Sequence, residues 1–185
     1  MWHILRRVAR VGPISAEPVV EPVVEPPSGS AGASPALEPG AVAREHIDAE
    51  LLRLLSRSLA VRVVDAGSCN GCEFELGALS NPYYNIEGRG LRFVASPRHA
   101  DVLLVTGPVT LHMRDALLRS YEAMPEPRLV VALGDCAADG GEFAGSYAVC
   151  GGVSEVLPVD LRIPGCPVPP LRVLQGLLEL VRQRR

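Results

Sequence analysis

Four short apolar runs, each ending in a loop signal, constrain the fold of this chain more than any other feature. Their residues are β-branched or apolar almost throughout, which is typical of strands that are covered on both faces. The four runs are Val61–Asp65, Leu91–Ala95, Asp101–Thr106 and Arg128–Leu133. Helical periodicity appears at Leu111–Met124 and again at Pro170–Arg184. Strands that alternate with helices predict a parallel α/β sheet.

The flanking segments differ from this alternating region. Leucines at Asp48–Leu59 share one broad helical face, so order is expected from about residue 45. Proline interrupts the apolar run Val156–Ile163, which predicts an edge strand or an extended loop. Residues 13–43 are rich in proline and glycine and contain no aromatic residue. We therefore expect a disordered, Pro-rich extension over residues 1–44 and one α/β domain over residues 45–185.

The composition and motifs exclude several classes of protein. A net charge of −3 offers no excess of basic residues for binding nucleic acid. Neither G-x-x-x-x-G-K-[ST] nor a G-x-G-x-x-G motif after a strand occurs, so we expect no bound nucleotide. No apolar run reaches the length of a membrane span or of a secretory signal. In a reducing compartment, cysteines bind metal more often than they form disulfides.

Four of the five cysteines follow predicted strands or extended segments. Cys69 and Cys72 form C-N-G-C just after the first strand, and Cys136 follows the fourth. Cys166 comes after the Pro-interrupted run. Loops at the carboxyl ends of parallel strands meet at one edge of a sheet, so these thiols are expected to converge there. We call Cys69, Cys72, Cys136 and Cys166 the four-cysteine set.

Four converging thiolates are typical of a tetrahedral zinc site or a [4Fe–4S] cluster. Structural zinc sites usually use two close pairs, whereas Cys136 and Cys166 are separate single residues, which favours a cluster. A redox dithiol at C-N-G-C and unrelated buried cysteines remain alternatives. The fifth cysteine, Cys150, is predicted to be an inert buried thiol, and the alternative is that it replaces Cys136 or Cys166 as a ligand.

Six segments of this chain occur together in one known family. They are C-N-G-C-E-F-E (Cys69–Glu75), S-P-R-H-A-D (Ser96–Asp101), T-G-P-V-T (Thr106–Thr110), M-P-E-P-R (Met124–Arg128), G-D-C-A-A-D-G-G (Gly134–Gly141) and P-V-D-L-R-I-P-G-C-P (Pro158–Pro167). Through them, the stretch from Val61 onward resembles the small iron–sulfur subunit shared by respiratory complex I, where it is the 20 kDa subunit, and membrane-bound [NiFe]-hydrogenases. C-N-G-C is similar to the formate-hydrogenlyase and hydrogenase-4 type, whereas M-P-E-P-R is more similar to complex I.

The fold class that we expect is α/β, a flavodoxin-like parallel sheet flanked by helices, with a cluster at the carboxyl ends of the strands. The resemblance implies that the four-cysteine set holds one [4Fe–4S] cluster. It also implies an electron-transfer subunit of a membrane-associated, hydrogenase-type oxidoreductase complex. Such a chain passes electrons to or from the active site of a large subunit and catalyses nothing in isolation.

The partners implied by the resemblance are a large subunit with a Ni–Fe or quinone site, a ferredoxin-like iron–sulfur subunit and, indirectly, membrane subunits. The implied location is peripheral, on the cytoplasmic face of the membrane, without a transmembrane helix. One alternative is a complex I-type NADH–quinone oxidoreductase 20 kDa subunit that passes electrons to quinone. An alternative from another class is a zinc-stabilised interaction module without redox activity.

Two further pairs of residues are candidates for supporting roles. Glu73 and Glu75 follow C-N-G-C and are expected to open a helix, whose positive end favours carboxylates. By the resemblance, one of them, with Glu75 preferred, relays protons or shapes a quinone site. Arg98 and His99 precede the third strand, where a positive charge could adjust the potential of a cluster. For both pairs, an ordinary structural role is the alternative.

Overall fold

Residues 58–183 are described by the computed structural model, and they form a five-stranded parallel sheet. Its strands are β1 (Leu59–Asp65), β2 (Leu91–Phe93), β3 (Val102–Thr106), β5 (Leu129–Leu133) and β7 (Leu161–Ile163). They lie in the order β2-β1-β3-β5-β7. Numbered by sequence within this sheet, that order is 2-1-3-4-5, which is the flavodoxin-like arrangement. The predicted fold class is therefore confirmed.

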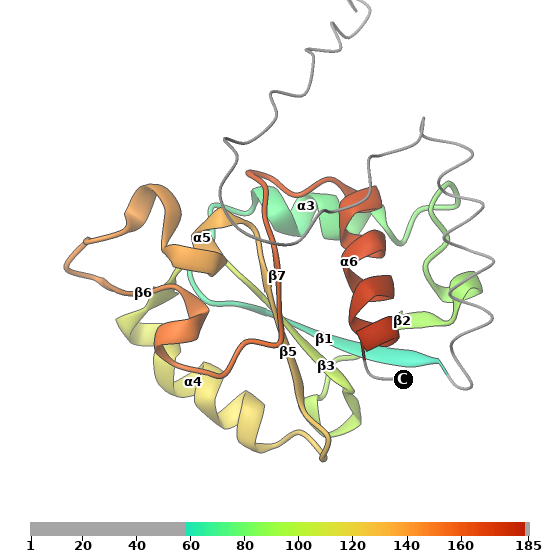
Figure 1. The fold of residues 1–185 in the computed structure, drawn as a ribbon, viewed down its shortest axis with the longest axis horizontal. Helices are drawn as coiled ribbons and strands as arrows, with labels where there is room; N and C mark the ends of the chain where they lie inside the picture. Colours follow the sequence, from blue (N-terminus) through green and yellow to red (C-terminus); the bar gives the residue numbers. More distant parts are fainter. Residues whose placement is uncertain (1–57, 184–185) are drawn as a thin grey trace, which may run out of the picture. The chain divides into compact units, whose positions relative to one another are not determined.

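Helices cover both faces of the sheet (Figure 1). They are α3 (Gly71–Ala78), α4 (Leu111–Glu122), α5 (Asp135–Asp139) and α6 (Pro170–Gln183). Helices α3 and α6 pack on one face, and α4 and α5 on the other. The remaining elements are an antiparallel pair, β4 (Val109–Thr110) with β6 (Val149–Gly151), and the 3₁₀ turns η1 (Glu87–Arg89), η2 (Pro97–His99), η3 (Gly141–Phe143) and η4 (Val153–Glu155).

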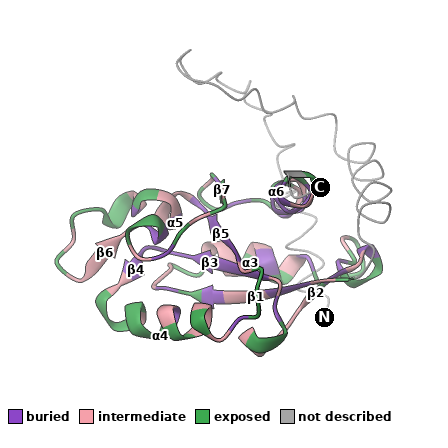
Figure 2. Ribbon diagram, turned by 60° about the horizontal axis from the view of Figure 1, so that its bottom comes forward, coloured by how far each residue is buried: buried purple, intermediate pink, exposed green. Residues whose placement is uncertain are grey.

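The core has two halves, one on each face of the sheet. Leu104 and Val131 contact the half that includes Leu174 of α6, whereas Leu103 and Val130 point to the half under α4. All residues of β3 and β5 are buried, as Figure 2 shows in purple, because both strands lie inside the sheet with helices on each side. Apolar side chains on both faces explain why these runs read as continuous rather than alternating.

Helix α6 holds the edge strand β7 against the rest of the domain. Its apolar residues recur at helical spacing and include Val173, Leu177 and Leu180, all buried. Gly176 lies directly against the side chain of Ile163, so a side chain larger than hydrogen at that position would force either Ile163 or α6 to shift. Helix α6 therefore supports the strand from which Cys166 extends.

The predicted elements agree with the structure except at a few boundaries. Strand β2 ends at Phe93 rather than Ala95, and α4 ends at Glu122 rather than Met124. The helix predicted over Asp48–Leu59 is wrong at its end, because Leu59 begins β1, where it is paired with Leu91. The rest of that helix and the Pro-rich extension lie outside the described residues. Within residues 58–183, none of the helices is long and apolar enough to span a bilayer.

Candidate functional site

Three loops at the carboxyl edge of the sheet carry the four-cysteine set. The first loop follows β1 and contains Cys69 and Cys72, the latter in the first turn of α3. The second follows β5 and places Cys136 in α5, and the third follows β7 and contains Cys166. Figure 1 shows α3, α5 and the end of β7 at the same end of the sheet. The sequence predicted this edge for the first two loops, and the pairing of β7 with β5 brings the third to it.

The first loop is ordered by a carboxylate at the end of β1. Asp65 Oδ1 accepts hydrogen bonds from the backbone N–H of Gly67 at 2.8 Å and of Ser68 at 2.7 Å. Ser68 Oγ in turn accepts from the backbone N–H of Asn70 at 3.0 Å. Asn70 has a positive φ of 71° and is the residue before helix α3. These contacts fix the backbone on both sides of Cys69.

The second and third loops are joined by backbone and side-chain hydrogen bonds. The N–H of Gly134 donates to the carbonyl of Ile163 at 2.8 Å, and that of Asp135 donates to the carbonyl of Gly165 at 3.1 Å. In return, the N–H of Gly165 donates to Asp135 Oδ1 at 2.8 Å. The residues that precede Cys136 and Cys166 are thus bonded to each other.

Two glycines let backbone approach the cysteine sulfurs. A Cβ on Gly134 would lie 3.0 Å from Cys72 Sγ and 3.3 Å from the carbonyl oxygen of Gly165. A Cβ on Gly141 would lie 2.9 Å from Cys136 Sγ. Both glycines have positive φ, which other residues adopt only with strain. Their lack of a side chain leaves space beside the two partly buried sulfurs.

The thiols of the four-cysteine set are close enough to influence one another electrostatically. Burial raises the pKa of the Cys72 thiol, and the charges of Glu73, Cys166 and Cys69 raise it further. Burial likewise raises the pKa of Cys136, followed by the charges of Cys166 and Cys69. Hydrogen bonds from the backbone of Val168 to Cys72 and of Glu142 to Cys136 act in the opposite direction. Cys72 and Cys136, which are partly buried, are therefore each affected by the charges of the exposed residues Cys69 and Cys166.

The raised pKa values predict slow alkylation of Cys72 and Cys136 in the metal-free chain. Only the thiolate reacts with iodoacetamide, and a raised pKa keeps the thiol protonated to higher pH. In the urea-unfolded chain, the alkylation rate should rise with pH and then level off. In the folded chain, the rate at Cys72 and Cys136 should level off only at a higher pH. Mass spectrometry of the labelled peptides measures both profiles. Identical pH profiles in the folded and unfolded chains would contradict this expectation.

The residues at this edge fit an iron–sulfur cluster chemically. Cluster iron is held by cysteine thiolates, and four cysteines are present on three separate loops. Glycine backbone passes close to Cys72 and Cys136, as a bulky inorganic core requires of its surroundings. Backbone N–H groups already point at two of the sulfurs. Across residues 58–183, no three His, Cys, Asp or Glu side chains are grouped closely enough to hold a single metal ion.

The two predicted acids differ in their surroundings. Glu73 lies in the first turn of α3, and both of its carboxylate oxygens are shielded from solvent without a hydrogen-bond partner among the described residues. Glu75 is partly exposed. Because a shielded carboxylate without a partner is costly, Glu73 is the more unusual of the two, although the sequence favoured Glu75. Its charge also acts on the Cys72 thiol.

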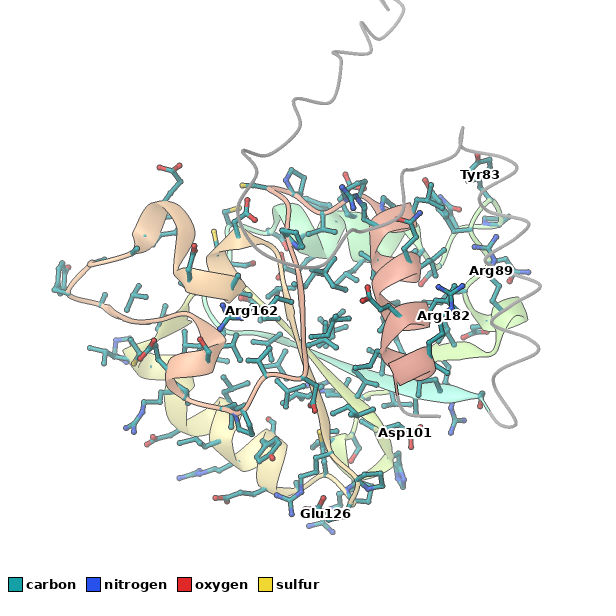
Figure 3. All side chains as sticks on the ribbon, viewed as in Figure 1. Tyr83, Arg89, Asp101, Glu126, Arg162 and Arg182 are labelled. Carbon is teal, nitrogen blue, oxygen red and sulfur yellow. The ribbon has the colours of Figure 1, made fainter. Side chains whose placement is uncertain are left out.

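Arg98 and His99 are not brought to the cysteines. Both lie in η2, which precedes β3, and both are exposed. Figure 3 shows Asp101, two residues later, at the end of the sheet away from α3 and α5. A five-residue strand spans roughly 16 Å, so the length of β3 separates these cations from the cysteine edge. The geometry does not support a role for them in adjusting the potential of a cluster.

Cys150 lies apart from the four-cysteine set. It belongs to β6 in the small antiparallel pair and packs, partly buried, against the core half under α4. It is not among the charges that act on Cys72 or Cys136. Both observations agree with an inert structural thiol.

Sequence reasoning missed Asp65 and Asp135, the two aspartates that order the cysteine loops. An aspartate at the end of a predicted strand is a known signal for a loop ordered by a side chain.

Fold and site together define a class of protein: an α/β domain that gathers four cysteines at the carboxyl edge of a flavodoxin-like sheet. The chain belongs to the family of the NADH ubiquinone oxidoreductase 20 kDa subunit, which it matches over residues 69–180. That span includes every member of the four-cysteine set. The resemblance stated from sequence motifs is therefore confirmed.

Two relatives are similar over about two-thirds of this chain. Formate hydrogenlyase subunit 7 of Escherichia coli is 45% identical over 128 residues, which is 69% of this chain and 50% of that protein. A probable membrane-bound hydrogenase subunit of Pyrococcus furiosus is 42% identical over 130 residues, which is 70% of this chain and 78% of that protein. This chain thus spans half the length of the Escherichia coli relative.

One solved structure is similar in fold as well as in sequence. It is that of the membrane-bound sulfane sulfur reductase, an archaeal respiratory membrane complex, with a TM-score of 0.59 and 29% sequence identity. The match covers 76% of each chain. The family and these relatives are subunits of oxidoreductase complexes, so this chain is of the same general kind.

Proposed function

We propose that this chain is the electron-transfer subunit of a membrane-associated, hydrogenase-type oxidoreductase complex. The four-cysteine set holds one [4Fe–4S] cluster, which relays electrons to or from the active site of a large subunit. The chain has no catalytic site of its own. Similarity to formate hydrogenlyase subunit 7 and to a membrane-bound hydrogenase subunit supports the hydrogenase branch of the family.

The observation that carries this proposal is the position of four cysteines on three loops at one edge of the sheet, after β1, β5 and β7. Cys72 and Cys136 come from separate loops, yet each is affected by the charges of both Cys69 and Cys166. The raised pKa values mean that these thiols resist ionisation together, and a bound cation would stabilise the thiolate form of all four. A cluster provides iron cations for this and uses ligands of this kind.

The cluster, when bound, supplies reversible one-electron transfer. The residues of this chain bind it and control its surroundings. Backbone N–H groups of Val168 and Glu142 donate to Cys72 and Cys136, and hydrogen bonds to cluster sulfur are one factor that sets the potential. Asp65 holds the backbone on either side of Cys69. Glu73 and Glu75 are the acids available beside Cys72 to hold or pass a proton.

Exposure at the cysteine edge supports a partner there. Cys69 and Cys166 are exposed, and the ring of Phe74 in α3 is 73% exposed. An exposed aromatic ring beside exposed ligands is suited to burial by another subunit. We assign this edge to the large subunit, with a ferredoxin-like iron–sulfur subunit as the other electron partner. Membrane subunits would hold the complex to the cytoplasmic face of the membrane, with this chain peripheral.

Two alternatives remain to be separated by experiment. The family description, NADH ubiquinone oxidoreductase 20 kDa subunit, favours a complex I-type role in which electrons pass to quinone. A zinc-stabilised interaction module would use the same four thiols without redox activity. The complex I-type role differs from the main proposal only in the large subunit, which would hold a quinone site instead of a Ni–Fe site. The zinc module differs in the metal that the thiols bind.

Metal analysis of the anaerobically purified chain tests the proposal. The protein should be brown and contain about four irons per chain, as a [4Fe–4S] cluster requires. Dithionite should bleach the colour and produce an electron paramagnetic resonance (EPR) signal. Colourless protein with stoichiometric zinc would overturn the proposal in favour of the zinc module. Nickel in the purified intact complex would separate the hydrogenase branch from the quinone branch.

A further inference from the structure

A reciprocal pair of hydrogen bonds links the second and third cysteine loops through Asp135. Its backbone N–H donates to the carbonyl of Gly165 at 3.1 Å, and its carboxylate accepts from the N–H of Gly165 at 2.8 Å. Gly165 is directly followed by Cys166, and Asp135 is directly followed by Cys136. The backbone and side chain of Asp135 together therefore fix the relative position of two residues, each adjacent to a predicted ligand.

The same arrangement occurs at the other end of these two strands. The N–H of Asp160 donates to the carbonyl of Val130 at 2.9 Å, and its carboxylate accepts from the N–H of Val130 at 2.8 Å. Strand β7 has only three residues and pairs with β5 alone within the sheet. An aspartate thus joins β7 to β5 at each end, but only Asp135 lies beside the cysteines.

Asp135 also brings a negative charge to the site. Its carboxylate is partly buried and belongs to the residue directly before Cys136. The hydrogen bond from Gly165 holds this charge in place. A fixed anion beside a cluster disfavours the addition of an electron, because reduction makes the cluster more negative.

We propose that Asp135 is a positioning residue that fixes the spacing of Cys136 and Cys166 and lowers the reduction potential of the cluster that they hold. This inference rests on the proposed function. The hydrogen bond and the charge make separable contributions. An asparagine at this position keeps an oxygen that accepts from Gly165 but removes the charge, whereas an alanine removes both.

The test compares Asp135→Asn and Asp135→Ala in the full chain, loaded anaerobically with iron and sulfide. The Asn variant should keep its iron through gel filtration and show a midpoint potential shifted to a more positive value. The Ala variant should lose iron several-fold faster and have an altered EPR signal. In the metal-free chain, hydrogen exchange at the Gly165 amide should be faster in the Ala variant than in wild type or the Asn variant.

Asp160→Ala is the matched control, because it removes the same kind of side-chain hydrogen bond at the opposite end of β7. It should lower stability but leave the iron content and potential unchanged. The proposal is overturned if Asp135→Ala keeps its iron and its potential, or if Asp135→Asn leaves the potential unchanged. Wild-type protein that binds no iron would overturn the proposed function, and the exchange of the Gly165 amide would still test whether Asp135 joins the two loops.

Discussion

Cys136→Ser is expected to abolish the cluster while the domain stays folded. Iron should fall from about four per chain to a small fraction of that value, since a serine hydroxyl is a poor substitute for a thiolate. Cys69→Ser and Cys166→Ser should have the same effect, because each removes one predicted ligand, from the loop after β1 and from the loop after β7 respectively. Iron analysis and visible absorbance measure the loss, and far-ultraviolet circular dichroism checks the fold.

Cys150→Ser is the control for these substitutions. Cys150 lies in β6, packed against the core half under α4, so its replacement should leave the iron content unchanged. A full iron content in Cys166→Ser together with its loss in Cys150→Ser would contradict the assignment of ligands. Such a result would instead support the alternative in which Cys150 replaces Cys166.

Gly134→Ala is expected to prevent cluster binding without touching a ligand. The added methyl group would lie 3.0 Å from Cys72 Sγ, where it forces the sulfur or the second loop to move. Gly134 also has φ 89° and ψ 162°, a conformation that costs other residues about 1–3 kcal/mol. Since small domains are stable by roughly 5–15 kcal/mol, the fold should persist. Iron per chain after anaerobic loading should drop several-fold.

Gly145→Ala separates backbone strain from the contact with sulfur. Gly145 also has a positive φ, of 79°, but a Cβ there would meet no atom within 4 Å. Both variants should lower the midpoint of urea unfolding, and only Gly134→Ala should lower the iron content. A full iron content in both variants would show that the space beside Cys72 is not required. Equal loss in both would trace the effect to backbone strain.

Much of the fold could be predicted from the sequence because its signals are local. The runs that became β1, β3 and β5 are apolar almost throughout, which is typical of strands covered on both faces. The position of Cys136 after β5 followed directly, since loops after parallel strands share one edge. The end of the helix predicted to reach Leu59 could not be found in this way. Pairing with Leu91, which is distant in sequence, made that residue part of a strand.

The candidate site was only partly readable. Glu73 and Glu75 are two residues apart and of the same residue type, but Glu73 is the one whose two carboxylate oxygens are shielded from solvent without a hydrogen-bond partner among the described residues. Arg98 and His99 belong to a motif shared with the family, yet they precede β3 and so lie at the wrong end of the sheet. Asp135 could not be recognised as a link between loops, because Gly165 is 30 residues away along the chain.

The sequence by itself determined the chemistry that is available: four cysteines placed after strands, in a chain whose motifs resemble those of the 20 kDa subunit family. Apolar periodicity and residue type depend on neighbours within a few positions, so they can be read without coordinates. Tertiary structure alone decided which cysteine thiols lie close enough to act electrostatically on one another. The pairing of β7 with β5, the support of α6 and the bond between Asp135 and Gly165 bring Cys166 to the other thiols. Contacts of this kind depend on side-chain packing and strand register between distant segments, which no local pattern encodes.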